Sequence, residues 1–198
     1  KNKKPERLEV VLDQPWFDPI THEPAMYRGL WSRKRLPEGN GTALYKRGPI
    51  ESYEGCWTKG QYQGQGRLVY STGDTYEGTF RASQRHGTGT HKWIDGRQYA
   101  GEWKRNIRTG HGVFTWPSGD RYEGEFVDGK RSGVGTFVFG SSGAYYTGQW
   151  LDGRYNGMGK TVDVSGAAYK GEFVNGQRHG FGEEYDEQGN VTASGNWI

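Results

Sequence analysis

The sequence predicts an all-β protein, an extended single-layer antiparallel sheet made of tandem β-hairpins. Three observations predict this fold. A short pattern recurs about every 23 residues, side-chain character alternates with a period of two inside each copy, and glycine is abundant. Glycine accounts for 34 of the 198 residues, against roughly 7% in an average protein.

The recurring pattern is Tyr-x-Gly-x-aromatic, first clear at 53–57 (YEGCW). Its opening tyrosine returns at spacings of 23, 23, 23, 24 and 23 residues. Positions in a repeat are given below as offsets from this tyrosine, which is offset 0. A Gly-x-Gly pair stands at offsets 11 and 13, and a third glycine near offset 20. The six tyrosines are Tyr53, Tyr76, Tyr99, Tyr122, Tyr146 and Tyr169.

Each repeat is expected to form one β-hairpin. Offsets 0, 2 and 4 share one face of a strand because successive side chains in a strand point to opposite faces. Offset 7 is glycine or asparagine in five of the six repeats, which favours a tight turn, and Ser83 is the exception. Offsets 11 to 17 form the second strand, and the glycine near offset 20 turns the chain into the next repeat. We expect the Gly-x-Gly glycines to leave room for aromatic rings that lie flat on the neighbouring strand.

The segment YKGEFVNGQRHGFG, residues 169–182, resembles the motif of the MORN family (membrane occupation and recognition nexus). The resemblance is strong over 53–192 and looser over 27–52. It implies a twisted half-pipe sheet and a scaffold or adaptor in cytoskeletal, ciliary or membrane-associated assemblies, in which the repeat array is not itself the catalyst.

The resemblance and the repeat pattern together suggest two regions. Residues 1–26 carry four prolines and clustered charges and are expected to form an extended N-terminal arm, in which LEVVL (8–12) could be a short strand. Residues 27–198 form the repeat array: a loose repeat at 27–52, six clear repeats over 53–192, and a truncated repeat at 193–198.

Composition narrows the function class. A single cysteine, Cys56, excludes an internal disulfide framework and fits an intracellular, reducing compartment, either cytoplasmic and cytoskeletal or that of a processed organellar protein. A net charge of +3 is too small to indicate nucleic acid. The histidines do not cluster, and no nucleophile stands in a catalytic motif. We therefore expect no enzyme activity, no cofactor and no metal.

Residues 153–161 (GRYNGMGKT) end like a phosphate-binding loop, which is spelled G-x-x-x-x-G-K-[ST]. The first glycine is one place too far away, and Gly157 and Gly159 fall at offsets 11 and 13, as in every other repeat. A phosphate-binding loop must open a helix, whereas Lys160 and Thr161 are expected to begin a strand. The sequence therefore argues against nucleotide binding here.

The aromatic face is the first candidate binding site, although most of its rings are expected to be structural and the alternative is that all of them form the core. A single layer has no second sheet to cover its rings, and exposed apolar surface on that scale usually marks an interaction site. We expect a groove that holds a segment of a protein partner, aromatic in its N-terminal half and more acidic toward Asp163 and Asp186. The predicted groove residues are Tyr53, Trp57, Tyr70, Tyr76, Phe80, Trp93, Tyr99, Trp103, Trp116, Tyr122, Phe126 and Phe139.

A second hypothesis is recruitment to an anionic membrane of phosphoinositide type. Arginines at offset 9 would line one rim of the array, and the lysine-rich start at 1–4 would add to their charge. Each such charge near an anionic membrane surface contributes about 1 kcal/mol of binding free energy. A weaker alternative is a cell-wall or carbohydrate-binding repeat. Protein partners are expected within a multi-subunit complex, and open sheet edges also make an end-to-end homodimer an expectation. The rim arginines are Arg85, Arg108, Arg131 and Arg178.

Overall fold

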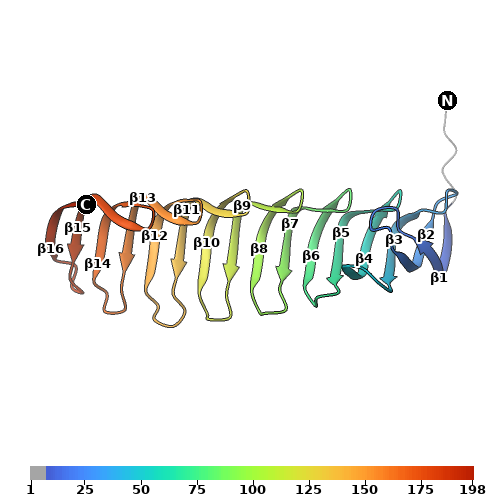
Figure 1. Ribbon diagram of the computed structural model, residues 1–198, viewed down its shortest axis with the longest axis horizontal. Coiled ribbons are helices and arrows are strands. Elements are labelled where there is room, and N and C mark those ends of the chain that lie inside the picture. The colour runs from blue at the N-terminus through green and yellow to red at the C-terminus, as the bar shows by residue number, and fades with distance from the viewer. Residues whose placement is uncertain (1–7) are drawn as a thin grey trace, which may run out of the picture. The chain divides into compact units, whose positions relative to one another are not determined.

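The protein is an open antiparallel β-sheet of sixteen strands that lie side by side in chain order, as the computed structural model of residues 8–198 shows (Figure 1). Each strand is hydrogen-bonded to the next strand along the chain. The described residues contain no helix. This all-β architecture of tandem hairpins is the one that the repeat pattern predicts.

The strands divide between two compact units, one containing residues up to 94 together with 103–106, the other 95–102 and 107–198. Strand β8 (Gln98–Lys104) contributes residues to both. The first unit contains β1 (Glu9–Phe17), β2 (Pro24–Trp31), β3 (Pro37–Tyr45), β4 (Ile50–Thr58), β5 (Gln61–Tyr70), β6 (Thr75–Arg81) and β7 (Gln84–Lys92). The second contains β9 (Ile107–Thr115), β10 (Arg121–Val127), β11 (Lys130–Val138), β12 (Tyr145–Leu151), β13 (Arg154–Val162), β14 (Ala168–Val174), β15 (Gln177–Tyr185) and β16 (Val191–Trp197).

The turn inside each repeat is a two-residue turn with positive φ at both positions. Between β12 and β13 these are Asp152 (φ 50°) and Gly153 (φ 85°), and between β14 and β15 they are Asn175 (φ 53°) and Gly176 (φ 90°). Two left-handed residues define the type I′ turn, whose twist matches that of the flanking strands. The prediction of a turn at offset 7 is therefore confirmed.

The Gly-x-Gly pair has two different roles, so the expectation that both glycines accommodate rings is wrong. The second glycine does so: a Cβ on Gly159 would lie 2.5 Å from the ring of Tyr146. The first glycine sits in a β-bulge. Gly124 pairs with Gly135 but Glu125 pairs with Ser132, which leaves two residues extra, and Gly133 takes φ 59°. Glycine adopts such a left-handed φ without strain.

The core is the ring layer itself. In the second unit Tyr122, Phe126 and Trp150 are each less than 5% exposed. The ring centroids of Tyr122 and Trp150 lie 5.0 Å apart in an edge-on arrangement, and those of Tyr122 and Phe126 lie 5.2 Å apart. Aromatic pairs favour this geometry because the positive ring edge meets the negative ring face.

The expected extended arm at 1–26 is folded over its described part. Strand β1 pairs with β2, with a bulge between Val11 and Gln14. Trp16 is 8% exposed and packs edge-on against Trp57 at 5.6 Å. This ring continues the aromatic core, which gives the segment a reason to add to the sheet. The lysines at 1–4 lie outside the described residues.

Candidate functional site

Most of the predicted groove residues are buried, so they form the core and do not line a surface. All eight rings at offsets 0 and 4 are at most 4% exposed. The prediction of an accessible groove is wrong for these eight residues, because the neighbouring rings cover one another edge-on. They are Tyr53, Trp57, Tyr76, Phe80, Tyr99, Trp103, Tyr122 and Phe126.

The aromatic residues at offset 17 remain accessible. Tyr70 ends strand β5, and the other three directly follow strands β7, β9 and β11, on the face that carries the rings. Tyr70 and Trp93 in the first unit and Trp116 in the second are half-buried, and Phe139 is 41% exposed. In the second unit Trp116 contacts the buried rings of Phe114 (4.4 Å) and Phe137 (5.5 Å). These rings stand on the core with one side open to solvent.

The arginines at offset 9 do not form a solvated rim. The guanidinium of Arg85 lies 4.4 Å from the ring of Trp103, and that of Arg131 lies 4.5 Å from Trp150. Arg108 donates to the backbone carbonyl of Gly129 at 2.8 Å, and Arg131 to that of Gly153 at 2.9 Å. Burial lowers the pKa of Arg131. The rim prediction is wrong for these three, and only Arg178 is exposed.

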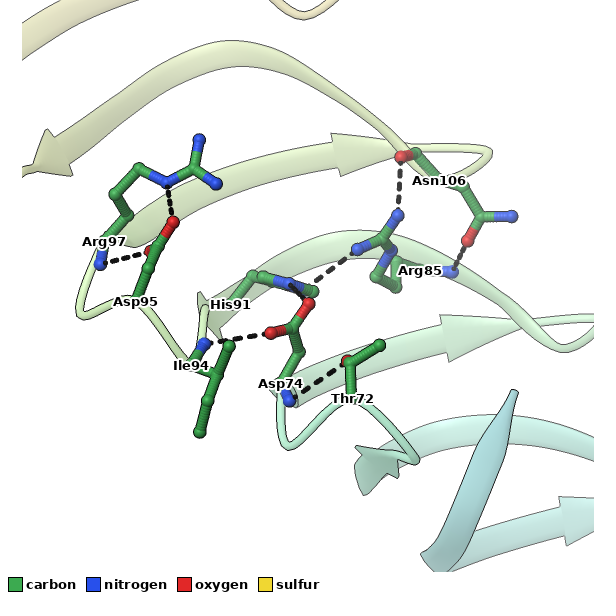
Figure 2. A network of polar contacts seen from close by, with 8 residues as sticks. All are labelled: Thr72, Asp74, Arg85, His91, Ile94, Asp95, Arg97 and Asn106. Atoms are coloured by element: carbon green, nitrogen blue, oxygen red, sulfur yellow. Dashed lines mark hydrogen bonds and ion pairs between the residues drawn. The ribbon is translucent and has the colours of Figure 1, made fainter. Parts of the chain in front are cut away.

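A polar network in the first unit holds Arg85 in place (Figure 2). Its Nη1 lies 3.0 Å from Nδ1 of His91, and its Nη2 donates to the carbonyl of Asn106. His91 is 4% exposed, and its Nε2 lies 3.8 Å from Oδ2 of Asp74, whose other oxygen accepts from the amide of Ile94. Sequence reasoning missed this network, although His91 occupies offset 15, where two other repeats carry Phe.

An open pocket of about 600 Å³ lies on the same face of the second unit. Its lining combines rings with charge: Phe139, Tyr155 and Tyr169 contribute rings, and four ionisable side chains surround them. Tyr155 stacks on Tyr146 with centroids 3.7 Å apart. The ionisable residues are Asp163, Arg178, Glu184 and Asp186.

The carboxylates of this pocket are fixed by turns. Oδ1 of Asp163 accepts from the amide of Ser165 at 2.8 Å and from its hydroxyl at 2.6 Å. Oδ2 of Asp186 accepts from the side-chain amide of Asn190 at 2.9 Å, and its Oδ1 accepts from the backbone amides of Asn190 and Gln188. Hydrogen bonds from these donors lower the pKa of Asp163 and of Asp186, so both are ionised at neutral pH. The acidic end that the sequence predicts therefore lines the pocket.

The repeat profile decides the family. The sequence profile of the MORN repeat matches residues 53–75, 76–96, 99–121, 122–143, 146–168 and 169–191. The chain belongs to the MORN repeat family. No curated protein sequence gave a significant match.

Solved structures similar to this MORN chain are distant in sequence. One is the TCP domain of SAS-4 from Drosophila melanogaster with a proline-rich motif of Ana2, at 11% identity, covering 93% of this chain and 89% of that chain, with TM-score 0.46. Another is the TCP10 domain of CPAP from Danio rerio with a peptide of STIL, at 13% identity, covering 93% and 99%, with TM-score 0.26. A third is BamB from Moraxella catarrhalis, at 10% identity, covering 93% and 76%, with TM-score 0.22. With TM-scores this low, these likenesses carry no argument about function.

The glutamate or glutamine at offset 3 of several MORN repeats has a role that sequence reasoning missed. Oε1 of Glu102 accepts from the amide of His111 at 2.7 Å, and Oε1 of Glu125 from that of Val134 at 3.1 Å. Gln149 does the same for Met158 at 2.8 Å. A period of two predicts that these side chains lie on the outer, solvated face, but each of these three reaches into the bulge of its own hairpin. Their recurrence at one offset was the signal available in the sequence.

Within residues 8–198, no group of three or more His, Cys, Asp and Glu side chains is arranged to hold a metal ion. No helix in this range is long and apolar enough to cross a membrane. Lys160 and Thr161 lie in strand β13 and do not open a helix, but they stand near the end of the strand and not at its beginning as expected.

Proposed function

We propose that this MORN array is a non-catalytic scaffold that binds a segment of a partner protein on the ring-bearing face of its second unit. The observation that carries the proposal is the contrast between buried and accessible rings. Trp116 and Phe139 stay open to solvent above a fully covered aromatic core, and Phe139 borders a pocket of about 600 Å³.

The chemistry of this face suits a peptide. Half-buried aromatic side chains in a concave site are typical anchors of protein interfaces, because they desolvate a large area without losing much side-chain entropy. The pocket adds hydroxyl and carboxylate groups that can fix the orientation of a bound chain. Pockets of this kind commonly combine an apolar lining with a few polar groups.

A random peptide library displayed on phage and selected on the full chain tests the proposal. Selected peptides should lose at least tenfold in affinity on Trp116→Ala or Phe139→Ala, since each removes a central aromatic anchor. The matched control is Val134→Ala. Val134 is 58% exposed on the same strand as Phe137 but points to the opposite face.

Two outcomes would reject the proposal. One is that no peptide is enriched on this chain. The other is that selected peptides bind equally to all three variants. Circular dichroism checks that each variant keeps its sheet, because Trp116 and Phe139 also contact core rings.

Membrane recruitment has less support. Arg85, Arg108 and Arg131 already lie over rings of the same face, which keeps their charges away from a planar membrane surface. Binding of the full chain to anionic vesicles at low salt would revive that hypothesis.

A further inference from the structure

The repeat that begins at Tyr146 lacks the cation that most repeats carry. Offset 9 is arginine in four of the six repeats, and each guanidinium lies near the tyrosine of its own repeat. The distances to the ring centroid are 5.8, 5.7, 5.7 and 4.4 Å for Arg85, Arg108, Arg131 and Arg178. In the repeat of Tyr146 the residue at offset 9 is Tyr155. Its ring, in place of a guanidinium, stacks on the ring of Tyr146 with centroids 3.7 Å apart. The rings of this face are thus guanidinium sites, and two repeats, those of Tyr53 and Tyr146, have no arginine of their own.

The other repeat with tyrosine at offset 9 shows how such a ring is covered. The ring of Tyr62 stacks on that of Tyr53 with centroids 3.8 Å apart. The hydroxyl of Tyr62 lies 2.7 Å from the hydroxyl of Tyr45. Tyr45 in turn donates to the buried carboxylate of Asp18 at 2.6 Å. Tyr62 is consequently only 4% exposed. Tyr155 has no such cover among the described residues, and it opens into the pocket.

The charges around Tyr155 are unbalanced. Three carboxylates line the pocket, Asp163, Glu184 and Asp186, against the single guanidinium of Arg178. Arg178 forms an ion pair with Glu184 and lies over the ring of Tyr169. Asp163 uses Oδ1 for its turn, and its Oδ2 makes no hydrogen bond within residues 8–198. The charged groups that line the pocket are therefore net negative beside the ring of Tyr155. The guanidinium of Arg131 also acts on Tyr155 but does not line the pocket.

We propose that this pocket binds an arginine side chain of the partner segment, beside the apolar anchor that Trp116 and Phe139 receive. The inference rests on the proposed function and names the chemistry of the partner. A guanidinium can stack on Tyr155 while it donates to the carboxylates of Asp163 and Asp186, as the chain's own arginines stack on rings and donate to carbonyls. Lysine lacks the planar group that both contacts use.

The spacing within the segment follows from the repeat. Phe139 and Asp163 stand at offset 17 in consecutive repeats, two strands apart, so about 10 Å separates them. An extended chain covers that distance in about three residues. The arginine accordingly stands two to four residues from the apolar anchor.

The same phage library tests the inference. Peptides selected on the full chain should be enriched in arginine two to four residues from an aromatic or aliphatic residue. One selected peptide is then synthesised with arginine or with citrulline, which keeps the shape and removes the charge. Citrulline should weaken binding about tenfold, as expected for loss of a charge-assisted hydrogen bond.

A double-mutant cycle locates the arginine. On Asp163→Asn the effect of citrulline should shrink to less than about threefold, because the charge partner is gone. Asparagine keeps the acceptor that the Ser165 turn requires. The control is Asp128→Asn, an exposed residue with φ 48° in the turn between β10 and β11 that does not line the pocket, where the full tenfold effect should persist.

The failures are distinguishable. Peptides that depend on Trp116 but show no arginine enrichment, or an unchanged citrulline effect on Asp163→Asn, overturn this inference and leave the proposed function intact. Peptides enriched in acidic residues overturn it as well. Absence of any selected peptide rejects the proposed function itself.

Discussion

At the scale of single residues, the opening tyrosine of each repeat makes two contacts, and phenylalanine could make only the first of them. Its ring lies on a glycine of the neighbouring strand, and its hydroxyl donates to the carbonyl at offset 3. This hydrogen bond recurs at 3.0 Å for Tyr99 and Tyr122 and at 2.7 Å for Tyr146. The accepting residue stands beside the bulge, where the ladder of backbone hydrogen bonds shifts register. The hydroxyl thus compensates locally for that irregularity.

We expect Tyr122→Phe to lower the free energy of unfolding by about 1–2 kcal/mol, because the carbonyl of Glu125 loses its donor. Urea unfolding followed by circular dichroism measures the change. The control is Tyr145→Phe, since the hydroxyl of Tyr145 makes no hydrogen bond within the described residues. Equal effects of the two substitutions would show that the hydroxyl contact contributes nothing.

The glycine on which the tyrosine ring lies gives a second prediction. Gly159→Ala places a Cβ 2.5 Å from the ring of Tyr146, and the buried ring cannot move away. We expect a loss of about 1–3 kcal/mol in unfolding free energy, as for other overpacked cores. Gly195→Ala is the matched control, because a Cβ there meets no atom within 4 Å. Thermal unfolding of both variants measures the difference. A Gly159→Ala protein as stable as the unchanged chain would show that the ring of Tyr146 does not require glycine at this position.

At the scale of the hairpin, the turns differ in how well their residues suit positive φ. The turn at Asn175 and Gly176 has the residues that type I′ favours, whereas β6 and β7 are joined by Ala82 (φ 50°) and Ser83 (φ 60°). Ser83 has a compensating contact, because its hydroxyl accepts from the amide of Tyr62 at 3.0 Å. Ala82 has a side chain without such a contact and bears the strain of the left-handed conformation.

Ala82→Asn should therefore stabilise the protein by about 0.5–1 kcal/mol, since asparagine tolerates the left-handed region better than alanine. The measurement is the midpoint of urea unfolding. Arg81→Asn, one residue earlier in strand β6, should bring no gain. A decrease in stability for Ala82→Asn would mean that the turn is not limited by its backbone conformation.

At the scale of the hairpin, some features could be predicted from the sequence and others could not. Hairpins and turns follow from local periodicity and from glycine placement, so they were predictable. The bulge could not be predicted, because a period of two does not show where extra residues enter a strand. The burial of Arg131 depends on rings of the following repeat, such as Trp150, and a single repeat does not contain that information. The pairing of β1 depends on Trp16, which lies outside the repeat pattern.

At the scale of the whole molecule, tyrosines are the main buried ionisable groups in both units. Burial raises the pKa of Tyr27 and Tyr76 in the first unit to about 12, and that of Tyr99 and Tyr122 in the second unit to about 12. Burial also raises the pKa of Tyr53 and Tyr146. In an unfolded chain the tyrosine pKa is about 10.

This difference sets the direction of the pH dependence. Above about pH 10 the unfolded chain releases phenolic protons that the folded chain keeps, so the unfolded state binds fewer protons and stability falls as pH rises. We expect the midpoint of urea unfolding to stay nearly constant between about pH 7 and pH 10 and to decrease steeply between about pH 10 and pH 12. Tyrosinate absorbance, recorded beside circular dichroism, should rise for these buried residues only as the sheet unfolds. Complete ionisation near pH 10 with an intact β-sheet spectrum would show that the tyrosine hydroxyls are open to solvent, contrary to their burial against glycine and carbonyl groups.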